Sequence, residues 1–264
     1  MNIIYFPHKL GQLKNGLQNS KLILNSIINK PINVVPCNNS TIDKNNFYNN
    51  LNNLYKINKL YKKKINIGGD HSMSIASISE SLNRYPNLKV LWFDAHPDIN
   101  TYEKSKTKNF HGMPLSYLTG LDYDENFKFI KNKLNFDNLL YIGVRDIDDY
   151  EAEIIEKNNI KSIKSNELNQ NPELCLKTIK NFIKNDPIHL SFDVDCMEPS
   201  IIPCTGTPVK DGLKLLETTH ILNNIYFDNI VNIDIVELNF EIGDDREKIK
   251  SINNFLYLFN NYFE

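Results

Sequence analysis

The sequence predicts an α/β fold, a three-layer αβα sandwich with a central, mainly parallel sheet of about eight strands. Short β-rich apolar runs alternate with segments whose apolar residues recur at helical spacing, which is typical of βαβ units. Right-handed crossovers would place helices on both faces of the sheet. The length of 264 residues suits one large α/β domain, so we expect residues 1–264 to form a single domain.

Apolar runs bounded by polar residues predict the strands, in chain order. They span residues 2–6, 32–36, 64–67, 89–93, 139–144, 160–164, 188–192 and 230–236. Helical spacing appears between them, in Phe47, Leu51, Leu54 and Tyr61 and again in Leu174, Ile179, Phe182 and Ile183. A last helix is expected after Asn239, and we find neither an internal repeat nor a long linker.

The bulk composition argues against two classes of partner. With a net charge of −2, the chain has no overall electrostatic preference for nucleic acid or for a membrane surface, and we expect neither. No apolar stretch is long enough for a signal peptide or a membrane span. The four cysteines form no CxxC pair, which favours free thiols in a reducing compartment and a cytoplasmic location.

Polar clusters follow the carboxyl ends of three predicted strands, where sites gather in open α/β sheets. The first is DAHPD at 94–98, directly after the strand 89–93. In an extended chain, residues two apart share a face, so Asp94, His96 and Asp98 would point the same way. A polar strand end with a capping aspartate is the simpler alternative.

The second cluster is SFDVD at 191–195, in which Asp193 and Asp195 share a face. Two carboxylates so close repel each other and resist burial unless a cation or a proton intervenes. An exposed acidic turn is the alternative, but the CMEP that follows is too apolar for a simple exposed turn.

The third cluster is GGDHS at 68–72, after the strand 64–67. Its paired glycines permit a tight turn and a close approach of the backbone. Taken alone, a glycine turn with a structural histidine explains it as well as a ligand does.

Together the three clusters predict a site with two divalent ions. They offer four carboxylates and two imidazoles, and two such ions would offset the carboxylate charge. Carboxylate and imidazole ligands without thiolate suit Mn²⁺, with Co²⁺ and Fe²⁺ as alternatives and Zn²⁺ less favoured. Two such ions can lower the pKa of a water molecule and make a nucleophile near neutral pH.

In these motifs and their order the chain resembles the arginase family of ureohydrolases. GGDHS, DAHPDIN at 94–100 and SFDVD are similar to its three metal signatures. Further matches are HGMP at 111–114, IGVRDID at 142–148, TGTP at 205–208 and DIVELN at 234–239. The resemblance covers about residues 64 to 240 well. It continues weakly at the start, where Gly11, Gln12 and Gly16 are similar to the opening loop of the family.

The resemblance implies two Mn²⁺ per chain and a role for each ligand. One ion would be held by His71, Asp94, Asp98 and Asp193, the other by His96, Asp94, Asp193 and Asp195, with Asp94 and Asp193 as bridges. By the same resemblance His111 would shuttle protons, Glu237 would pair with the substrate guanidinium and Thr207 would add a hydroxyl contact. Asp98 would deliver a proton to the leaving amine. Alternatively, His111 is a histidine at the start of a helix, and Glu237 is a carboxylate at the end of a strand, without a catalytic role.

The resemblance also implies the substrate. Asn100 and Thr107 match arginase positions that contact the α-carboxylate of arginine, and Asp148 matches the acidic residue that meets its α-amino group. The expected reaction is the hydrolysis of L-arginine to L-ornithine and urea. The expected partners are this small guanidino substrate and copies of the chain itself, in a homo-oligomer that would be a trimer or a hexamer.

Several departures from the family pattern leave alternatives open. Lys108 and Asp211 stand where the family often has glycine, and CMEP at 196–199 replaces its usual GLDP. An agmatinase, a guanidino-acid hydrolase or a formiminoglutamase would share the metal ligands. A catalytically silent member, a single-zinc deacylase of the same fold and a two-metal phosphoesterase are further alternatives. The phosphoesterase would need an Arg or Lys cluster beside the ligands, which the sequence lacks.

Overall fold

The computed structural model describes residues 1–19, 21, 24–25 and 28–263, and its strands form one parallel sheet. The order across the sheet is β2-β1-β3-β8-β7-β4-β5-β6. The strands are β1 (Asn2–Tyr5), β2 (Ile32–Val34), β3 (Lys64–Ile67), β4 (Lys89–Phe93), β5 (Leu139–Ile142), β6 (Lys161–Ile163), β7 (Ile188–Asp193) and β8 (Ile230–Val236). Each predicted strand is confirmed, with ends that shift by at most two residues.

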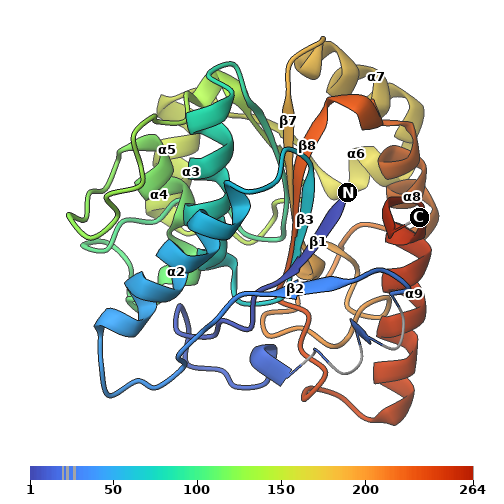
Figure 1. Ribbon diagram of the computed structural model, residues 1–264. Coiled ribbons are helices and arrows are strands. Elements are labelled where there is room, and N and C mark those ends of the chain that lie inside the picture. The colour runs from blue at the N-terminus through green and yellow to red at the C-terminus, as the bar shows by residue number, and fades with distance from the viewer. Residues whose placement is uncertain (20, 22–23, 26–27, 264) are drawn as a thin grey trace.

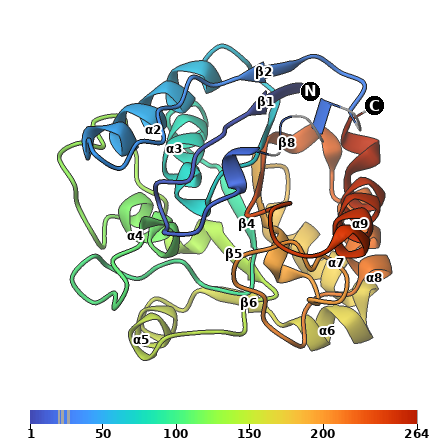
Figure 2. The ribbon, with the colours of Figure 1, turned by 90° about the horizontal axis from the view of Figure 1, so that it is seen from below.

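Helices cover both faces of this sheet and make the three layers that the sequence predicts (Figure 1, Figure 2). One face carries α2 (Asn45–Asn58), α3 (Ser74–Arg84), α4 (Pro114–Thr119) and α5 (Asp149–Lys157). The other carries α6 (Ser165–Gln170), α7 (Pro172–Ile183), α8 (Leu215–Asn224) and α9 (Asp245–Phe263). The helix predicted from Phe47 ends at Asn58, so Tyr61 lies beyond it.

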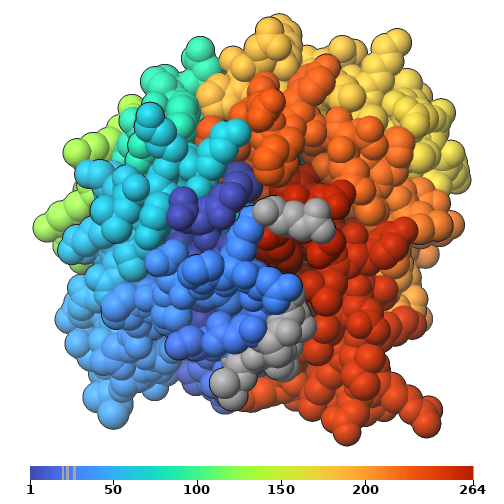
Figure 3. All heavy atoms as spheres, turned by 45° about the vertical axis from the view of Figure 1, so that its right-hand side comes forward, coloured from blue at the N-terminus to red at the C-terminus, as the bar shows by residue number. Residues whose placement is uncertain are grey.

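The side-chain alternation of the central strands builds a core on each face. Leu91 and Phe93 of β4 pack with α7, α8 and α9, whereas Val90 and Trp92 pack on the opposite face. Because both faces are covered, β7 and β8 are buried along their whole length, although β7 alternates apolar and polar residues and β8 carries Asn232 and Asp234. Figure 3 shows the N-terminal segments, in blue, beside the C-terminal helix α9, in red. Within the described residues, no helix combines the length and the apolar character needed to cross a membrane.

The strand order determines where the polar clusters meet. β3, β8, β7 and β4 are neighbours in the sheet, although they come from distant parts of the chain. Since all the strands are parallel, the loops after them emerge at one edge. The three clusters that the sequence singled out follow β3, β4 and β7, and Glu237 follows β8.

Candidate metal centre

His71 opens a short 3-10 helix, η2 (His71–Met73), directly after the glycine turn at the end of β3. Asp70 caps this helix, because its carboxylate accepts a hydrogen bond from the backbone of Ser72 at 3.1 Å. The same carboxylate accepts one from the backbone of Gly11, in the N-terminal loop, at 2.8 Å. The His71 ring stacks on Trp92 with centroids 4.1 Å apart, and its Nε2 lies 2.8 Å from Ser191 Oγ. These contacts hold the ring so that Nδ1 faces the carboxylates.

Three aspartates converge on that nitrogen. His71 Nδ1 lies 3.0 Å from Asp94 Oδ2, 3.1 Å from Asp98 Oδ2 and 3.2 Å from Asp193 Oδ2. The nitrogen is buried and has no hydrogen-bond partner among the described residues. A nitrogen without a hydrogen bond at the meeting point of three carboxylates is the arrangement expected of a cation site. The residues therefore fit a divalent ion.

A second group surrounds His96 and shares Asp94 with the first. His96 Nδ1 lies 3.2 Å from Asp195 Oδ2 and 3.5 Å from Asp94 Oδ1. Ligand atoms of His71, Asp94 and Asp193 lie close enough to hold one ion, and so do those of His96, Asp94 and Asp195. All six residues that the sequence singled out thus come together. By these distances Asp94 belongs to both groups, whereas Asp193 belongs to the first.

The carboxylates of the cluster repel one another, and a positive charge between them would relieve this repulsion. The four aspartates are at most 7% exposed. Burial, followed by the charges of Asp195 and Asp94, raises the pKa of Asp193 well above its usual value. Burial and the charge of Asp94 raise the pKa of Asp98 to about 6. Burial and the charge of Asp94 also raise the pKa of Asp195. Protons are thus favoured at three of the four carboxylates, and divalent ions would offset the same repulsion.

The histidines respond in the opposite sense. Burial alone would lower the pKa of His96, but the carboxylates of Asp195 and Asp94 raise it to about 12. Burial likewise opposes the charge on His71, but Asp193, Asp94 and Asp98 raise its pKa well above the usual value. A metal ligand must be a neutral imidazole, so binding of an ion would release these protons.

Two residues of the site have strained backbones. Asp98 and Glu237 have φ angles of 48° and 63°, in the left-handed region that side chains other than glycine rarely adopt. The Asp98 carbonyl accepts a hydrogen bond from Leu115 at 3.0 Å, and the Glu237 amide donates one to Gly69 at 3.1 Å. The surrounding fold thus holds both conformations, as is common at functional sites. Lys108 and Asp211 also have positive φ, at 61° and 62°, which explains why glycine suits these positions in the family.

Glu237 is buried beside the cluster, where three donors meet its carboxylate. Gln12 Nε2 donates to its two oxygens, at 2.8 and 2.6 Å, and the backbone of His71 donates to Oε1 at 3.1 Å. His111, in the 3-10 helix η3 (Phe110–Gly112), has its Nδ1 3.2 Å from Oε1. Burial opposes the charge on His111, but the hydrogen bond and charge of Glu237 raise its pKa to about 9.

A cleft of about 200 Å³ opens over the cluster. Asn100, Thr107, Asp148 and Thr207 line it, together with His96, Asp98, His111, Asp193 and Asp195. Asn100 Nδ2 donates to Asp148 Oδ2 at 3.1 Å, and Thr207 Oγ1 donates to Asp195 Oδ2 at 2.8 Å. Glu237 is the one sequence-predicted contact that does not line this cleft, since its carboxylate is bonded to Gln12.

Several polar residues at the site have no role that the sequence predicts. Glu151 lines the cleft, and its carboxylate accepts hydrogen bonds from the backbone of Asp148 and of Ile99, each at 3.2 Å. The Asp-x-x-Glu spacing of a capping box at the start of α5 is the signal that could have found it. For Gln12 the only signal was the weak resemblance of the segment around Gly11 to the family. Its contact with Glu237 joins residues 225 positions apart, and no local pattern indicates such a contact.

A buried polar network supports the site from below. Ser191 Oγ, which contacts His71, lies 3.3 Å from Ser74 Oγ, and Ser74 donates to Asp234 Oδ2 at 2.9 Å. Asp234 is fully buried on β8 and pairs with His189 Nε2 at 3.0 Å. Burial opposes this charge, but His189 and the hydrogen-bond donors lower the pKa of Asp234. The network ties α3, β7 and β8 together beneath the His71 ring.

Comparison with known proteins identifies relatives of this site and fold. Residues 11–254 match the profile of the Arginase family. A curated arginase of Glaciozyma antarctica is 38% identical over 190 residues, which cover 68% of this chain and 55% of that protein. The arginase of Saccharomyces cerevisiae is 34% identical over 208 residues, or 74% of this chain and 62% of that protein. The chain thus spans between half and two thirds of the length of these curated relatives.

Solved structures resemble the whole chain. The arginase of Entamoeba histolytica in complex with L-ornithine has a TM-score of 0.88 and 28% identity, covering 98% of this chain and 99% of that one. A formimidoylglutamase of Bacillus subtilis has a TM-score of 0.79 at 16% identity, covering 99% of this chain and 86% of that one, which shows a shared fold alone. Because the family profile matches most of its residues, the chain belongs to the arginase family.

Proposed function

We propose that this protein hydrolyses the guanidinium group of L-arginine to L-ornithine and urea, and that it uses two Mn²⁺ per chain. The observation that carries the proposal is the pair of ligand groups that share Asp94 beneath a small polar cleft. Family membership supports it, as does the similarity to an arginase whose structure contains L-ornithine, the expected product.

The first ion would be held by His71, Asp94, Asp98 and Asp193, and the second by His96, Asp94, Asp193 and Asp195. The distances around the two histidine nitrogens support every assignment except Asp193 in the second group. When bound, such ions activate a water molecule for nucleophilic attack near neutral pH. Manganese suits the ligand set, because it contains carboxylates and imidazoles but no thiolate.

The protein's own residues would bind the substrate and move its protons. Glu237 would accept the guanidinium as a two-point fork, in exchange for the Gln12 amide that now occupies both oxygens. Asp98 would pass a proton to the leaving amine. The His111 side chain is 21% exposed, so its ring would take up and release protons and move them between the site and solvent.

The far end of the substrate would lie along the outer part of the cleft. Asn100 and Thr107 would donate to the α-carboxylate, and Asp148 would accept from the α-amino group. Thr207, whose hydroxyl lies 2.8 Å from Asp195 Oδ2, would add its contact near the guanidinium end instead. Asn100 and Asp148 are already hydrogen-bonded, so one substrate could meet both. Agmatinase, guanidino-acid hydrolase and formiminoglutamase activities remain the alternatives, because they share the ligands and differ in this outer part.

A substrate panel tests the proposal. The protein, loaded with manganese, would be assayed with arginine, agmatine, guanidinobutyrate and formiminoglutamate. We expect urea release that is fastest with arginine, is lost after chelation and returns with Mn²⁺ more fully than with Mg²⁺. Full activity of protein verified to be metal-free would refute the two-metal site, and faster turnover of another compound would reassign the substrate.

Asp148→Ala separates arginine recognition from metal binding. Asp148 is exposed at the cleft, so solvent weakens its pairing with an ammonium group, and we expect a loss of about tenfold or more in kcat/KM for arginine. Guanidinobutyrate, which lacks the α-amino group, should change much less. Asp149→Ala removes the neighbouring carboxylate and is the matched control. Equal losses for both substrates would mean that Asp148 supports the site and not recognition.

Three broader expectations complete the proposal. The site and the fold lie in one domain, residues 1–264. The protein assembles into a trimer or a hexamer, as the family resemblance implies. It works in the cytoplasm, where the four cysteines would keep the free thiols that they have here.

A further inference from the structure

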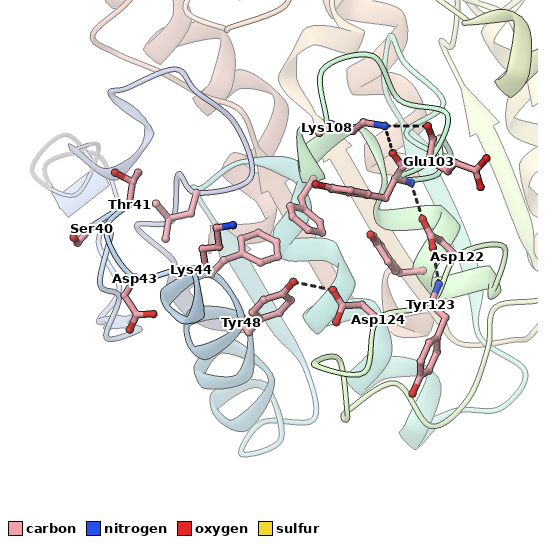
Figure 4. A pocket seen from close by; sticks show the side chains of 15 residues that line it. Ser40, Thr41, Asp43, Lys44, Tyr48, Glu103, Lys108, Asp122, Tyr123 and Asp124 are labelled. Atoms are coloured by element: carbon pink, nitrogen blue, oxygen red, sulfur yellow. Dashed lines mark hydrogen bonds between the residues drawn. The ribbon is translucent and has the colours of Figure 1, made fainter.

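A second cavity, of about 850 Å³, lies on the other side of the loop that carries His111. It opens between the N-terminal end of α2 and the loops that follow β4 and α4 (Figure 4). None of the residues that line it lines the cleft over the metal ligands. Its volume lies in the range of cavities that bind small molecules.

Aromatic rings form the inner part of this cavity. Phe47 of α2 and Phe110 stack with centroids 4.4 Å apart, and Tyr48 and Tyr117 flank Phe110 at 6.4 and 6.0 Å. At the rim, the Lys108 ammonium already lies 5.2 Å above the centre of the Tyr102 ring. The ammonium group of Lys108 thus already forms a cation–π contact at the rim.

Four residues that line the cavity carry carboxylates without a cationic partner among the described residues, although the Glu103 side chain points outward (Figure 4). Asp43, Glu103, Asp122 and Asp124 line the cavity, and none forms an ion pair within the described part of the chain. Asp124 accepts a hydrogen bond from the Tyr48 hydroxyl at 2.8 Å, and Asp122 accepts one from the Tyr102 backbone at 2.6 Å, so both carboxylates are held in place (Figure 4).

The two lysines of the cavity offset this charge only in part. Lys108 donates its ammonium protons to the carbonyls of Tyr102 and Glu103, at 2.6 and 2.9 Å, and so leaves the carboxylates unpaired. Lys44 is exposed at the edge of α2. Four carboxylates against two ammonium groups leave the cavity with an excess of negative charge beside aromatic faces.

We propose that this cavity binds a small organic ammonium ion with an apolar body. The ammonium group would lie near Asp122 and Asp124, against the tyrosine ring faces, where the charge and the ring quadrupoles attract it. The apolar body would pack on Phe47 and Phe110. A neutral molecule of the same shape would gain the packing but not the electrostatic attraction.

The loop between the two cavities connects this ligand to the candidate metal centre. Tyr102, Glu103, Lys108 and Phe110 face the aromatic cavity, whereas Asn100, Ser105, Thr107, Asn109 and His111 line the cleft. A bound amine would therefore contact the loop that also carries the proposed substrate contacts.

Calorimetric titration tests the proposal on the full chain loaded with manganese. The probes are hexylammonium and hexanol, which match in shape and differ in charge. We expect saturable one-to-one binding of hexylammonium and at least about tenfold weaker binding of hexanol. Absence of saturable hexylammonium binding, or equal binding of hexanol, would overturn the proposal, and both measurements use the unaltered protein.

Two variants then locate the site. Asp122→Asn combined with Asp124→Asn keeps acceptor oxygens for Tyr48 and Tyr102 but removes both charges. It should weaken hexylammonium binding at least about tenfold. Glu125→Gln, which removes an exposed carboxylate of the same loop that does not line the cavity, should leave binding unchanged. Unchanged binding by the double variant would assign the amine to another place, including the cleft over the metal ligands, and would sink the proposal.

Discussion

Replacing Asp94 with asparagine is expected to abolish urea release from arginine, with a fall in kcat on the order of a thousandfold or more. The bound ions are expected to supply several kcal/mol of the catalytic stabilisation, and each 1.36 kcal/mol corresponds to about tenfold in rate. Asp94 is the residue that both ligand groups share, so its change should weaken both ions at once. Asparagine keeps the shape of the side chain but removes its charge. Its amide NH2 would also replace one of the two oxygens that accept hydrogen bonds from Trp92 Nε1 and from the His96 backbone.

Metal content and fluorescence are the measurements for this variant. Trp92 is the only tryptophan of the chain and stacks on His71, so Mn²⁺ binding should quench its emission in the wild type but not in Asp94→Asn. Asp146→Asn is the control, since its exposed carboxylate lies 3.6 Å from His96 Nε2 but belongs to neither group. It should keep both ions. An Asp94→Asn protein with full metal content and activity would contradict the proposed site.

Glu237→Gln should lower kcat/KM for arginine by about a hundredfold or more while the metal content stays unchanged. A buried carboxylate that pairs with a guanidinium contributes several kcal/mol, and the neutral amide cannot replace it. Glu237 is in neither ligand group, so its loss should not release the ions. Glu241→Gln alters an exposed glutamate in the same loop and serves as the control. A parallel loss of metal would mean that Glu237 supports the ligands instead of the substrate.

The same variant has a readout that does not depend on catalysis. In the metal-free protein, NMR titration should find the His111 ring protonated up to about pH 9, because Glu237 raises its pKa. With glutamine at position 237, burial opposes only the charges of Asp98 and Asp70, so the pKa of His111 should fall well below about 9. Because the folded-state pKa is raised, the pair stabilises the wild type fully below pH 6.5, and this contribution is lost as pH rises through about 9. An unchanged His111 pKa in the variant would show that the pair does not form in solution.

Much of the fold followed from local pattern. Most of the strands were predictable because they are rich in apolar residues and buried, as in a parallel sheet covered on both faces, whereas the edge strand β6 has a single buried residue. The choice of the six candidate ligand residues was also local, since Asp94, His96 and Asp98, or Asp193 and Asp195, are spaced to share a face as a strand ends. The sequence by itself therefore determined the layers, the edge of the sheet where the polar clusters lie and the side-chain types available there as ligands.

The tertiary structure alone decided which residues meet. β3, β8, β7 and β4 become neighbours through pairings between distant segments, and nothing in their local sequence encodes that order. Only this order makes Asp94 common to both ligand groups and brings Gln12 onto Glu237. The aromatic cavity has the same origin, because Phe47 and Phe110 stack across 63 positions of the chain. Local pattern specifies faces and strand ends, whereas contacts between distant segments depend on the packing of the whole core.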